Sequence, residues 1–215
     1  MKSLKPYYSL AKQIYKNENT GHNFGHIKRV LKTCQKIWKT EGGDYFTLCV
    51  AALFHDMHRV MSKTKHVTAP ESVVEVKKLL APFNLNQSDL NKILYLIENH
   101  ENKTIKNVEH QELYILIDAD IIDALGKRGL KRTLKYCKTK NIPTHNLNYA
   151  LNSNEYVPDI NPLSTSHYVY RTMIPQANLL HSNIAKNFAK QKLNVLKRFV
   201  EREAKVKYTD IEKQR

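Results

Sequence analysis

Apolar residues recur at helical spacing through most of the chain. One such run is Ile27, Val30, Leu31, Cys34 and Ile37, and intervals of three and four residues are typical of a helix with one buried face. Similar patterns predict helices near residues 44–54, 71–80, 89–100, 111–125 and 175–205, although 113–117 alone would also suit a strand. Residues 141–163 are rich in proline and asparagine, which predicts a long loop or lid. With no repeat and no clear domain boundary, residues 1–215 are expected to form a single all-α domain, a helical bundle.

Composition narrows the class of protein. The chain has 215 residues, of which 41% are apolar, so it can bury a substantial core. No apolar run approaches the roughly 20 residues that span a bilayer, and the first residues lack the apolar segment of a signal peptide. The three cysteines form no CxxC pair. We therefore expect a cytoplasmic protein that does not associate with membranes and has reduced, buried or half-buried thiols that bind no metal.

The charge favours an anionic ligand. The formal net charge is +15, and such a field attracts nucleotides, nucleic acid or acidic membrane surfaces. The lysines are dispersed, however, with a dense stretch only at residues 186–213. Aromatic residues alternate with basic ones too sparsely, as at residues 135–138, to indicate a stacking surface for bases. A small phosphorylated substrate is therefore the expected partner, and nucleic acid is an alternative that is not favoured.

Four residues suggest a metal site. His55 and Asp56 end an apolar run, His26 opens an amphipathic segment, and Asp120 lies in the apolar segment 111–125. Burying such side chains is costly unless they are paired or bind a metal. Three packed helices could bring all four to one cavity, where two imidazoles and two carboxylates suit Mn²⁺, Fe²⁺, Co²⁺, Ni²⁺, Zn²⁺ or Mg²⁺. Such an ion would activate water and polarise a P–O bond.

The order of these residues resembles the HD-domain superfamily of metal-dependent phosphohydrolases. The matching segments are residues 22–30 (HNFGHIKRV), 51–56 (AALFHD) and 117–126 (IDADIIDALG). Residues 164–170 (STSHYVY) are similar to a stretch of a small stand-alone subgroup of bacterial HD hydrolases. The resemblance implies an HD-type helical bundle whose metal ligands are His26, His55, Asp56 and Asp120. Asp118 is the alternative for the fourth ligand.

The resemblance also implies roles for residues around the metal. His22 would orient water or phosphate, and His100 would lie near a second metal or the phosphate. Many relatives carry lysine or glutamate three residues after the HD aspartate, where this chain has Arg59. Arginine clamps phosphate oxygens but is a poor proton donor or acceptor, so Arg59 is predicted to bind substrate phosphate. Acid–base work then falls to metal-activated water with Asp56 or a nearby histidine.

Two further residues are weaker candidates for substrate binding. Lys63 would add positive charge near the site, and His167 would reach over it from the last loop, with Arg171 nearby. For Lys63 the alternative is a surface residue, and for His167 and Arg171 it is loop packing.

The predicted function is hydrolysis of a phosphoester or phosphoanhydride bond, most plausibly in a nucleotide. One alternative is a non-catalytic module on the same fold that binds nucleotide or nucleic acid. Another is a di-iron oxygenase, which would need extra ligands such as His22, His100 and Asp118. The base of the nucleotide, the number of ions and the oligomeric state are left open.

Overall fold

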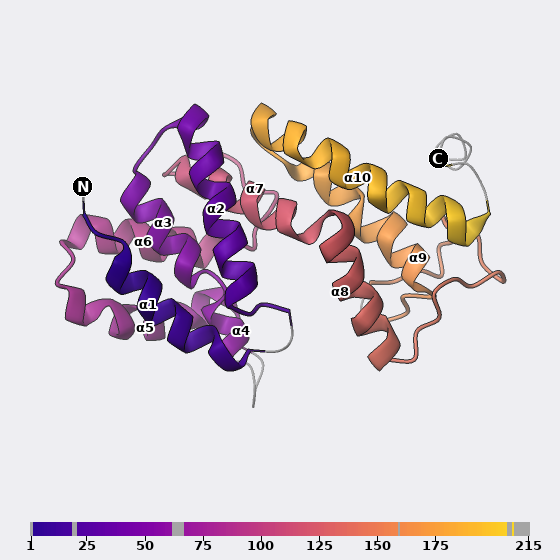
Figure 1. Cartoon of the computed structure of the whole chain (residues 1–215), viewed down its shortest axis with the longest axis horizontal. Helices are drawn as coiled ribbons and strands as arrows, with labels where there is room; N and C mark the ends of the chain where they lie inside the picture. Colours follow the sequence, from indigo (N-terminus) through magenta and orange to yellow (C-terminus); the bar gives the residue numbers. More distant parts are fainter. Residues whose placement is uncertain (1, 19–20, 62–66, 159, 206–207, 209–215) are drawn as a thin grey trace. The chain divides into compact units, whose positions relative to one another are not determined.

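The computed structural model describes residues 2–18, 21–61, 67–158, 160–205 and 208. Within these ranges the regular elements are helices, joined by loops that contain one isolated antiparallel bridge between Val157 and Asn161 (Figure 1). The predicted all-α class is therefore confirmed. The chain packs as two compact units, residues 1–120 and 121–215, and each is described by itself. None of the described helices has the length and apolar character that crossing a membrane requires.

The first unit is built around one helix that is apolar on all sides. Its elements are α1 (Lys5–Ile14), η1 (Tyr15–Asn17), α2 (Phe24–Glu41), α3 (Tyr45–Phe54), α4 (Met57–Met61), α5 (Ala69–Leu80), η2 (Ala81–Phe83), α6 (Gln87–Asn99) and most of α7 (Glu112–Ala124). Helix α3 packs against α1, α2 and α6, and every residue of α3 from position 47 to 54 is buried. A helix with no polar face is stable only when it is enclosed, so α3 forms the centre of this unit.

Side-chain caps fix where the central helices begin. The Asn23 side chain accepts hydrogen bonds from the backbone N–H groups of Gly25 and His26 at the start of α2. The Asp44 side chain does the same for Phe46 and Thr47 at the start of α3. Each cap satisfies N–H groups that have no partner inside the helix. His26 is thereby fixed in the first turn of α2.

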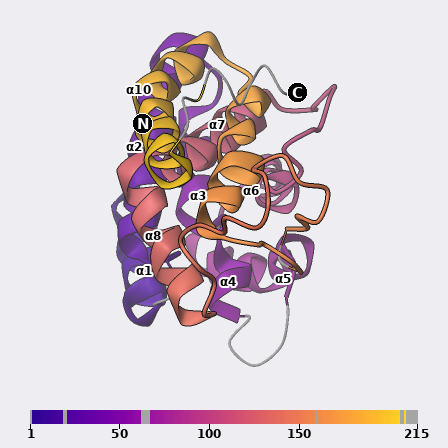
Figure 2. The same cartoon turned by 90° about the vertical axis from the view of Figure 1, so that its right-hand side faces the viewer.

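The second unit packs α10 (Asn183–Ala204) against α8 (Gly126–Thr139) and α9 (Thr165–Tyr168), as both views show (Figures 1 and 2). A π-helical turn (Val169–Met173) and the 3-10 helix η4 (Pro175–Leu179) follow α9. At Gly129 of α8, a Cβ atom would lie 1.7 Å from the carbonyl oxygen of Ala124. Only glycine allows the backbone to approach this closely.

The predicted elements agree with the structure over residues 26–125 and fail in part outside this range. Helices overlap all the predicted ranges from 26 to 125, and 141–163 is a loop apart from the isolated bridge. The prediction of one helix from residue 175 is wrong, because Leu180 is extended and Ser182 caps a new helix that begins at Asn183. Helices α1 and α8 were not predicted. The three cysteines are free and buried, as expected.

A buried carboxylate joins three helices of the first unit. Glu112, in the first turn of α7, accepts hydrogen bonds from Lys92 of α6, at 2.7 Å, and from the backbone N–H of Asp44 at the start of α3. Burial opposes the charge of Glu112, but the bonds from Lys92 and Asp44 prevail and hold its pKa below the ordinary 4.5. The ionised form of Glu112 therefore stabilises the fold.

We expect Glu112→Gln to lower the free energy of unfolding by about 2 kcal/mol at neutral pH, because a charged hydrogen-bond acceptor is lost. The pKa is lower in the folded chain than in the unfolded one, so this stabilisation is complete above the unfolded pKa. It is lost as the pH falls through the folded pKa. Urea unfolding of the wild type and the variant, repeated on acidification from pH 7, measures it. Glu98→Gln, on the exposed side of α6, is the control. A loss of unfolding free energy in Glu112→Gln that does not change with pH would contradict the account.

Candidate metal centre

Helix ends bring the predicted ligands together in the first unit. His26 lies in the first turn of α2, and His55 is the C-cap of α3 with Asp56 directly after it. His100 is the C-cap of α6, and Asp120 lies in α7. Adjacent residues diverge by about 100° inside a helix. At the end of α3, the side chains of His55 and Asp56 nevertheless face the same point.

Their polar atoms converge within a few ångströms. The Nε2 atoms of His26 and His55 lie 3.2 Å apart. Oδ2 of Asp56 lies 2.9 Å from Nε2 of His26 and 3.4 Å from Nε2 of His55. Oδ1 of Asp120 lies 3.6 Å from Nε2 of His26. Two nitrogens that each bind one ion at about 2.1 Å lie roughly 3.0–3.4 Å apart, which agrees with the spacing of His26 and His55.

Backbone carbonyls orient two of the imidazoles. Nδ1 of His55 lies 3.0 Å from the carbonyl oxygen of Ala52, and Nδ1 of His100 lies 2.6 Å from that of Ile97. Because a carbonyl only accepts, both Nδ1 atoms must donate, and in a neutral ring Nε2 then keeps its lone pair. Metal-binding histidines are usually held in this way. The Nε2 lone pairs of His55 and His100 are therefore available as ligands.

The site holds neutral imidazoles beside charged carboxylates. Burial lowers the pKa of His55 to about 4, although Asp56 opposes the shift. Burial likewise lowers the pKa of His100. For Asp56, burial favours the neutral acid, but His55 and hydrogen bonds from His22 and His26 hold its pKa well below the ordinary value. For Asp120, burial is again outweighed, chiefly by Lys103, and its pKa is about 2. One buried and one half-buried negative charge, on Asp56 and Asp120, therefore favour a bound cation.

The donor set fits a divalent metal. Six residues form three overlapping groups of three whose ligand atoms lie within 4.8 Å of one another. The groups are His22, His26 and Asp56; His26, His55 and Asp120; and His55, Asp56 and His100. Imidazole and carboxylate ligands without thiolate suit Mn²⁺, Fe²⁺, Co²⁺, Ni²⁺ or Zn²⁺. The four predicted ligands all belong to these groups, as do His22 and His100.

His22 touches the carboxylate at the centre of the site. Its Nδ1 lies 2.7 Å from Oδ2 of Asp56, the same oxygen that faces His26 and His55. The His22 side chain keeps 28% of its surface exposed, against 5% for that of Asp56. His22 therefore stands at the solvent side of the cluster.

Arg59 has a protein partner that the sequence did not indicate. Nη2 of Arg59 lies 2.7 Å from Oε1 of Glu101, and Nε2 of His58 lies 3.2 Å from the same oxygen. The hydrogen bond from His58 is the main cause that lowers the pKa of Glu101 to about 2. Glu101 follows His100 directly, so this ion pair lies beside the metal centre. Phosphate binding by Arg59 stays a prediction.

A buried tyrosine near the site also had no signal in the sequence. Tyr15 of η1 is fully buried, and within the described part of the chain its hydroxyl has no hydrogen-bond partner. Burial raises the pKa of Tyr15, and the charge of Asp56 raises it further. The ring therefore lies within electrostatic range of the central carboxylate.

The remaining candidates lie elsewhere or outside the described residues. Lys63 falls in the undescribed segment 62–66. His167 is in the second unit, where Nδ1 lies 2.7 Å from Oγ of Ser164 and Nε2 lies 3.1 Å from the carbonyl oxygen of Ala150. A substrate contact through this ring would therefore require one bond to break. Arg171 donates to the Ser153 carbonyl.

Comparison with known proteins identifies the part of the chain that holds the candidate metal ligands. Residues 23–125 match the family model of the HD domain. These residues form an HD domain. The match contains all four predicted ligands, so the predicted HD domain is confirmed.

Relatives extend the likeness beyond the HD domain. Protein YpgQ of Bacillus subtilis strain 168 is 24% identical over 207 residues, which cover 93% of both chains. The crystal structure of an HD-superfamily hydrolase from Bacillus thuringiensis has a TM-score of 0.72 at 23% identity and 93% coverage of both chains. The structure of B. subtilis YpgQ in complex with ADP has a TM-score of 0.68 at 20% identity, covering 93% of this chain and 96% of YpgQ. The fold around the HD domain is therefore shared as well.

The geometry distinguishes the two candidates for the fourth ligand. Asp120 joins the histidines, whereas Asp118 is buried and belongs to none of the three groups. We expect Asp120→Asn to weaken Mn²⁺ binding by more than about 100-fold. Asp118→Asn should leave the Mn²⁺ affinity nearly unchanged.

Isothermal titration calorimetry with Mn²⁺ measures both affinities, and thermal unfolding without metal checks that each variant is folded. Equal losses of Mn²⁺ affinity in the two folded variants would refute the assignment of Asp120.

Proposed function

We propose that this protein is a metal-dependent phosphohydrolase that cleaves a phosphoester or phosphoanhydride bond in a nucleotide. The observation that carries the proposal is the convergence of His26, His55, Asp56 and Asp120 on one point. Two ionised carboxylates, Asp56 and Asp120, face the neutral imidazole of His55. Relatives of the same fold that are described as HD-superfamily hydrolases support the reaction class.

These four residues would hold the ion. A divalent ion supplies Lewis-acid chemistry, lowering the pKa of water and polarising the P–O bond under attack. The protein's part is to fix the donors: the carbonyls of Ala52 and Ile97 hold His55 and His100 in the tautomer whose Nε2 is free. His100 contributes a further lone pair near Asp56 that suits a second ion.

His22 and Asp56 are the groups placed to move a proton. Nδ1 of His22 lies 2.7 Å from the Asp56 carboxylate, so a proton can pass between them along a hydrogen bond. The partial exposure of His22 gives it contact with solvent. Because His22 contacts both the Asp56 carboxylate and the solvent, we assign it to orienting water or phosphate.

A nucleotide is the substrate class that we favour. Bacillus subtilis YpgQ, which shares this fold, was crystallised with ADP. The net charge of +15 also favours an anionic ligand. Arg59, beside His100 through its pair with Glu101, is the proposed contact to the substrate phosphate.

A phosphate and pyrophosphate release screen over a nucleotide panel with Mn²⁺ tests the reaction. We expect release that requires the metal and is abolished in Asp56→Ala. Glu98→Ala, which removes an exposed carboxylate of α6, is the matched control and should keep full activity. Binding of metal and nucleotide without turnover would indicate a non-catalytic module instead, and an iron-loaded protein that consumes oxygen would indicate the di-iron oxygenase.

The phosphate-binding role of Arg59 predicts a particular kinetic change. Arg59→Lys keeps the charge but loses the bidentate fork, so KM should rise about tenfold while kcat changes little. Steady-state kinetics on the best nucleotide of the panel measures both constants. Arg198→Lys on the exposed face of α10 is the control. A fall in kcat at constant KM would exclude a simple binding clamp.

A further inference from the structure

The positive charge of the chain is concentrated in the second unit. Residues 121–215 hold eighteen of the 35 lysines and arginines but only seven of the 20 acidic residues. Most of the net charge of +15 therefore belongs to fewer than half of the residues. None of these basic residues is among the candidate metal ligands.

Helix α8 presents much of this charge on one side. Successive residues turn by about 100°, which places its six basic residues within an arc of roughly 140° of the helix. They are Lys127, Arg128, Lys131, Arg132, Lys135 and Lys138. All are exposed except Arg132, which is half-buried and lies 3.9 Å from Asp123. Helix α8 contains no acidic residue, so we call these six residues the basic face.

The opposite side of α8 is turned into the protein. Gly126, Gly129 and Cys137 are buried there, and α10 and α9 pack against the helix. A helix that inserts into a membrane surface needs a free apolar side. Since the apolar side of α8 is used in the fold, the basic face suits phosphate groups in solution better than a lipid bilayer.

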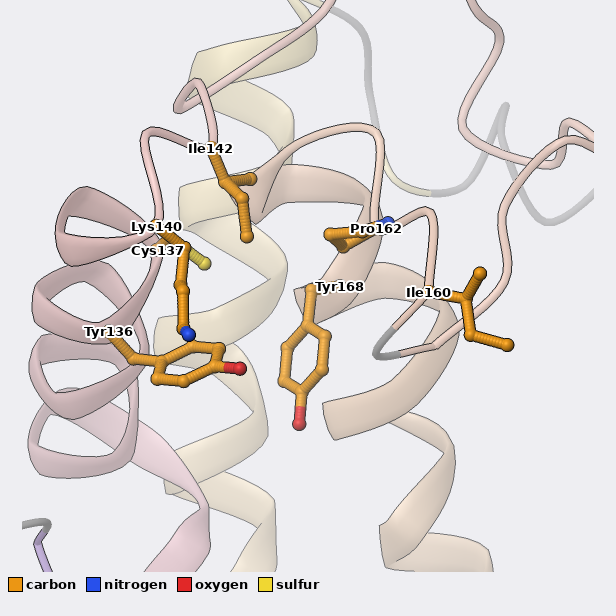
Figure 3. Close-up of a pocket in the computed structure, with 7 residues that line it drawn as sticks. All are labelled: Tyr136, Cys137, Lys140, Ile142, Ile160, Pro162 and Tyr168. Carbon is orange, nitrogen blue, oxygen red and sulfur yellow. The ribbon is translucent and has the colours of Figure 1, made fainter.

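A pocket with two tyrosines adjoins the end of this helix. Its volume is about 270 Å³, and Tyr136, Lys140, Ile142, Pro162 and Tyr168 are among the residues that line it. The rings of Tyr136 and Tyr168 and the side chain of Lys140 point into the same space (Figure 3). The volume is slightly below the roughly 300 Å³ at which pockets for drug-sized ligands begin, so one planar ring system suits it.

Tyr136 links the pocket to the basic face. It follows Lys135 on α8, and 50% of its surface is exposed. Tyr168 comes from α9, more than thirty residues further along the chain. The sequence showed too few aromatic residues among the basic ones, but the fold adds the second ring from a distant segment.

We propose that the second unit binds single-stranded nucleic acid, with backbone phosphates along the basic face of α8 and one base stacked on Tyr136 in the adjoining pocket. Proteins that bind single strands combine a positively charged track with aromatic rings on which bases stack. Both features occur here on one helix and its neighbour. The proposal does not depend on hydrolysis at the metal centre.

Fluorescence anisotropy with labelled oligo(U) and oligo(dT) of about 12 nucleotides tests the phosphate contacts. The triple variant Lys131→Gln, Lys135→Gln, Lys138→Gln should bind more weakly. When the logarithm of its affinity is plotted against the logarithm of the salt concentration, the slope should be shallower by about 2. This corresponds to about 0.7 for each of the three phosphate contacts that are lost. A second triple variant, Lys12→Gln, Lys39→Gln, Lys77→Gln, removes the same charge from exposed positions of the first unit and should match the wild type.

The stacking contact is tested separately. Tyr136→Ala should weaken binding about tenfold without changing the salt dependence, and Tyr136→Phe, which keeps the ring, should bind like the wild type. The oligo(U) and oligo(dT) arms show whether RNA or DNA is preferred.

Three results would overturn the proposal. The first is no binding of either oligonucleotide at about 50 mM salt. The second is an equal loss of affinity in the two triple variants. The third is binding to phosphatidylserine vesicles, or to a duplex of the same length, that is tighter than binding to the single strands.

Discussion

The first unit depends on one buried carboxylate oxygen. Oδ2 of Asp56 lies within 3.4 Å of nitrogens of His22, His26 and His55, which come from the loop before α2, from α2 and from the end of α3. A carboxylate this deeply buried is costly unless charge or hydrogen bonds compensate it. The start of α2 and the end of α3 place the histidines that compensate this buried charge.

The sequence predicted this centre because chemistry and periodicity coincided there. His26, His55, Asp56 and Asp120 interrupt apolar helical patterns, where burying a polar side chain is costly unless it is paired or binds a metal. Glu101 was missed because an exposed glutamate belongs to no periodic pattern. Its ion pair with Arg59 joins residues 42 positions apart and forms only in the folded chain. The start of α10 was predicted too early because Pro175 suits the first turn of either a 3-10 or an α-helix.

Helix α8 was missed for a different reason. Its glycines suggest a break, yet Gly129 is required by the close approach of the Ala124 carbonyl. The same omission hid the basic face, since lysines that seem dispersed along a sequence gather on one side once the helix is formed. Tyr168 likewise reaches the pocket of Tyr136 only through the long loop between α8 and α9. Long-range packing of this kind leaves no local pattern in a sequence.

The most direct test of the metal centre is anomalous X-ray diffraction from crystals grown with Mn²⁺. The account predicts an anomalous peak within about 2.3 Å of Nε2 of His26 and His55 and of carboxylate oxygens of Asp56 and Asp120, in line with ordinary metal–ligand distances. Strong Mn²⁺ peaks elsewhere, with none between these four side chains, would contradict it.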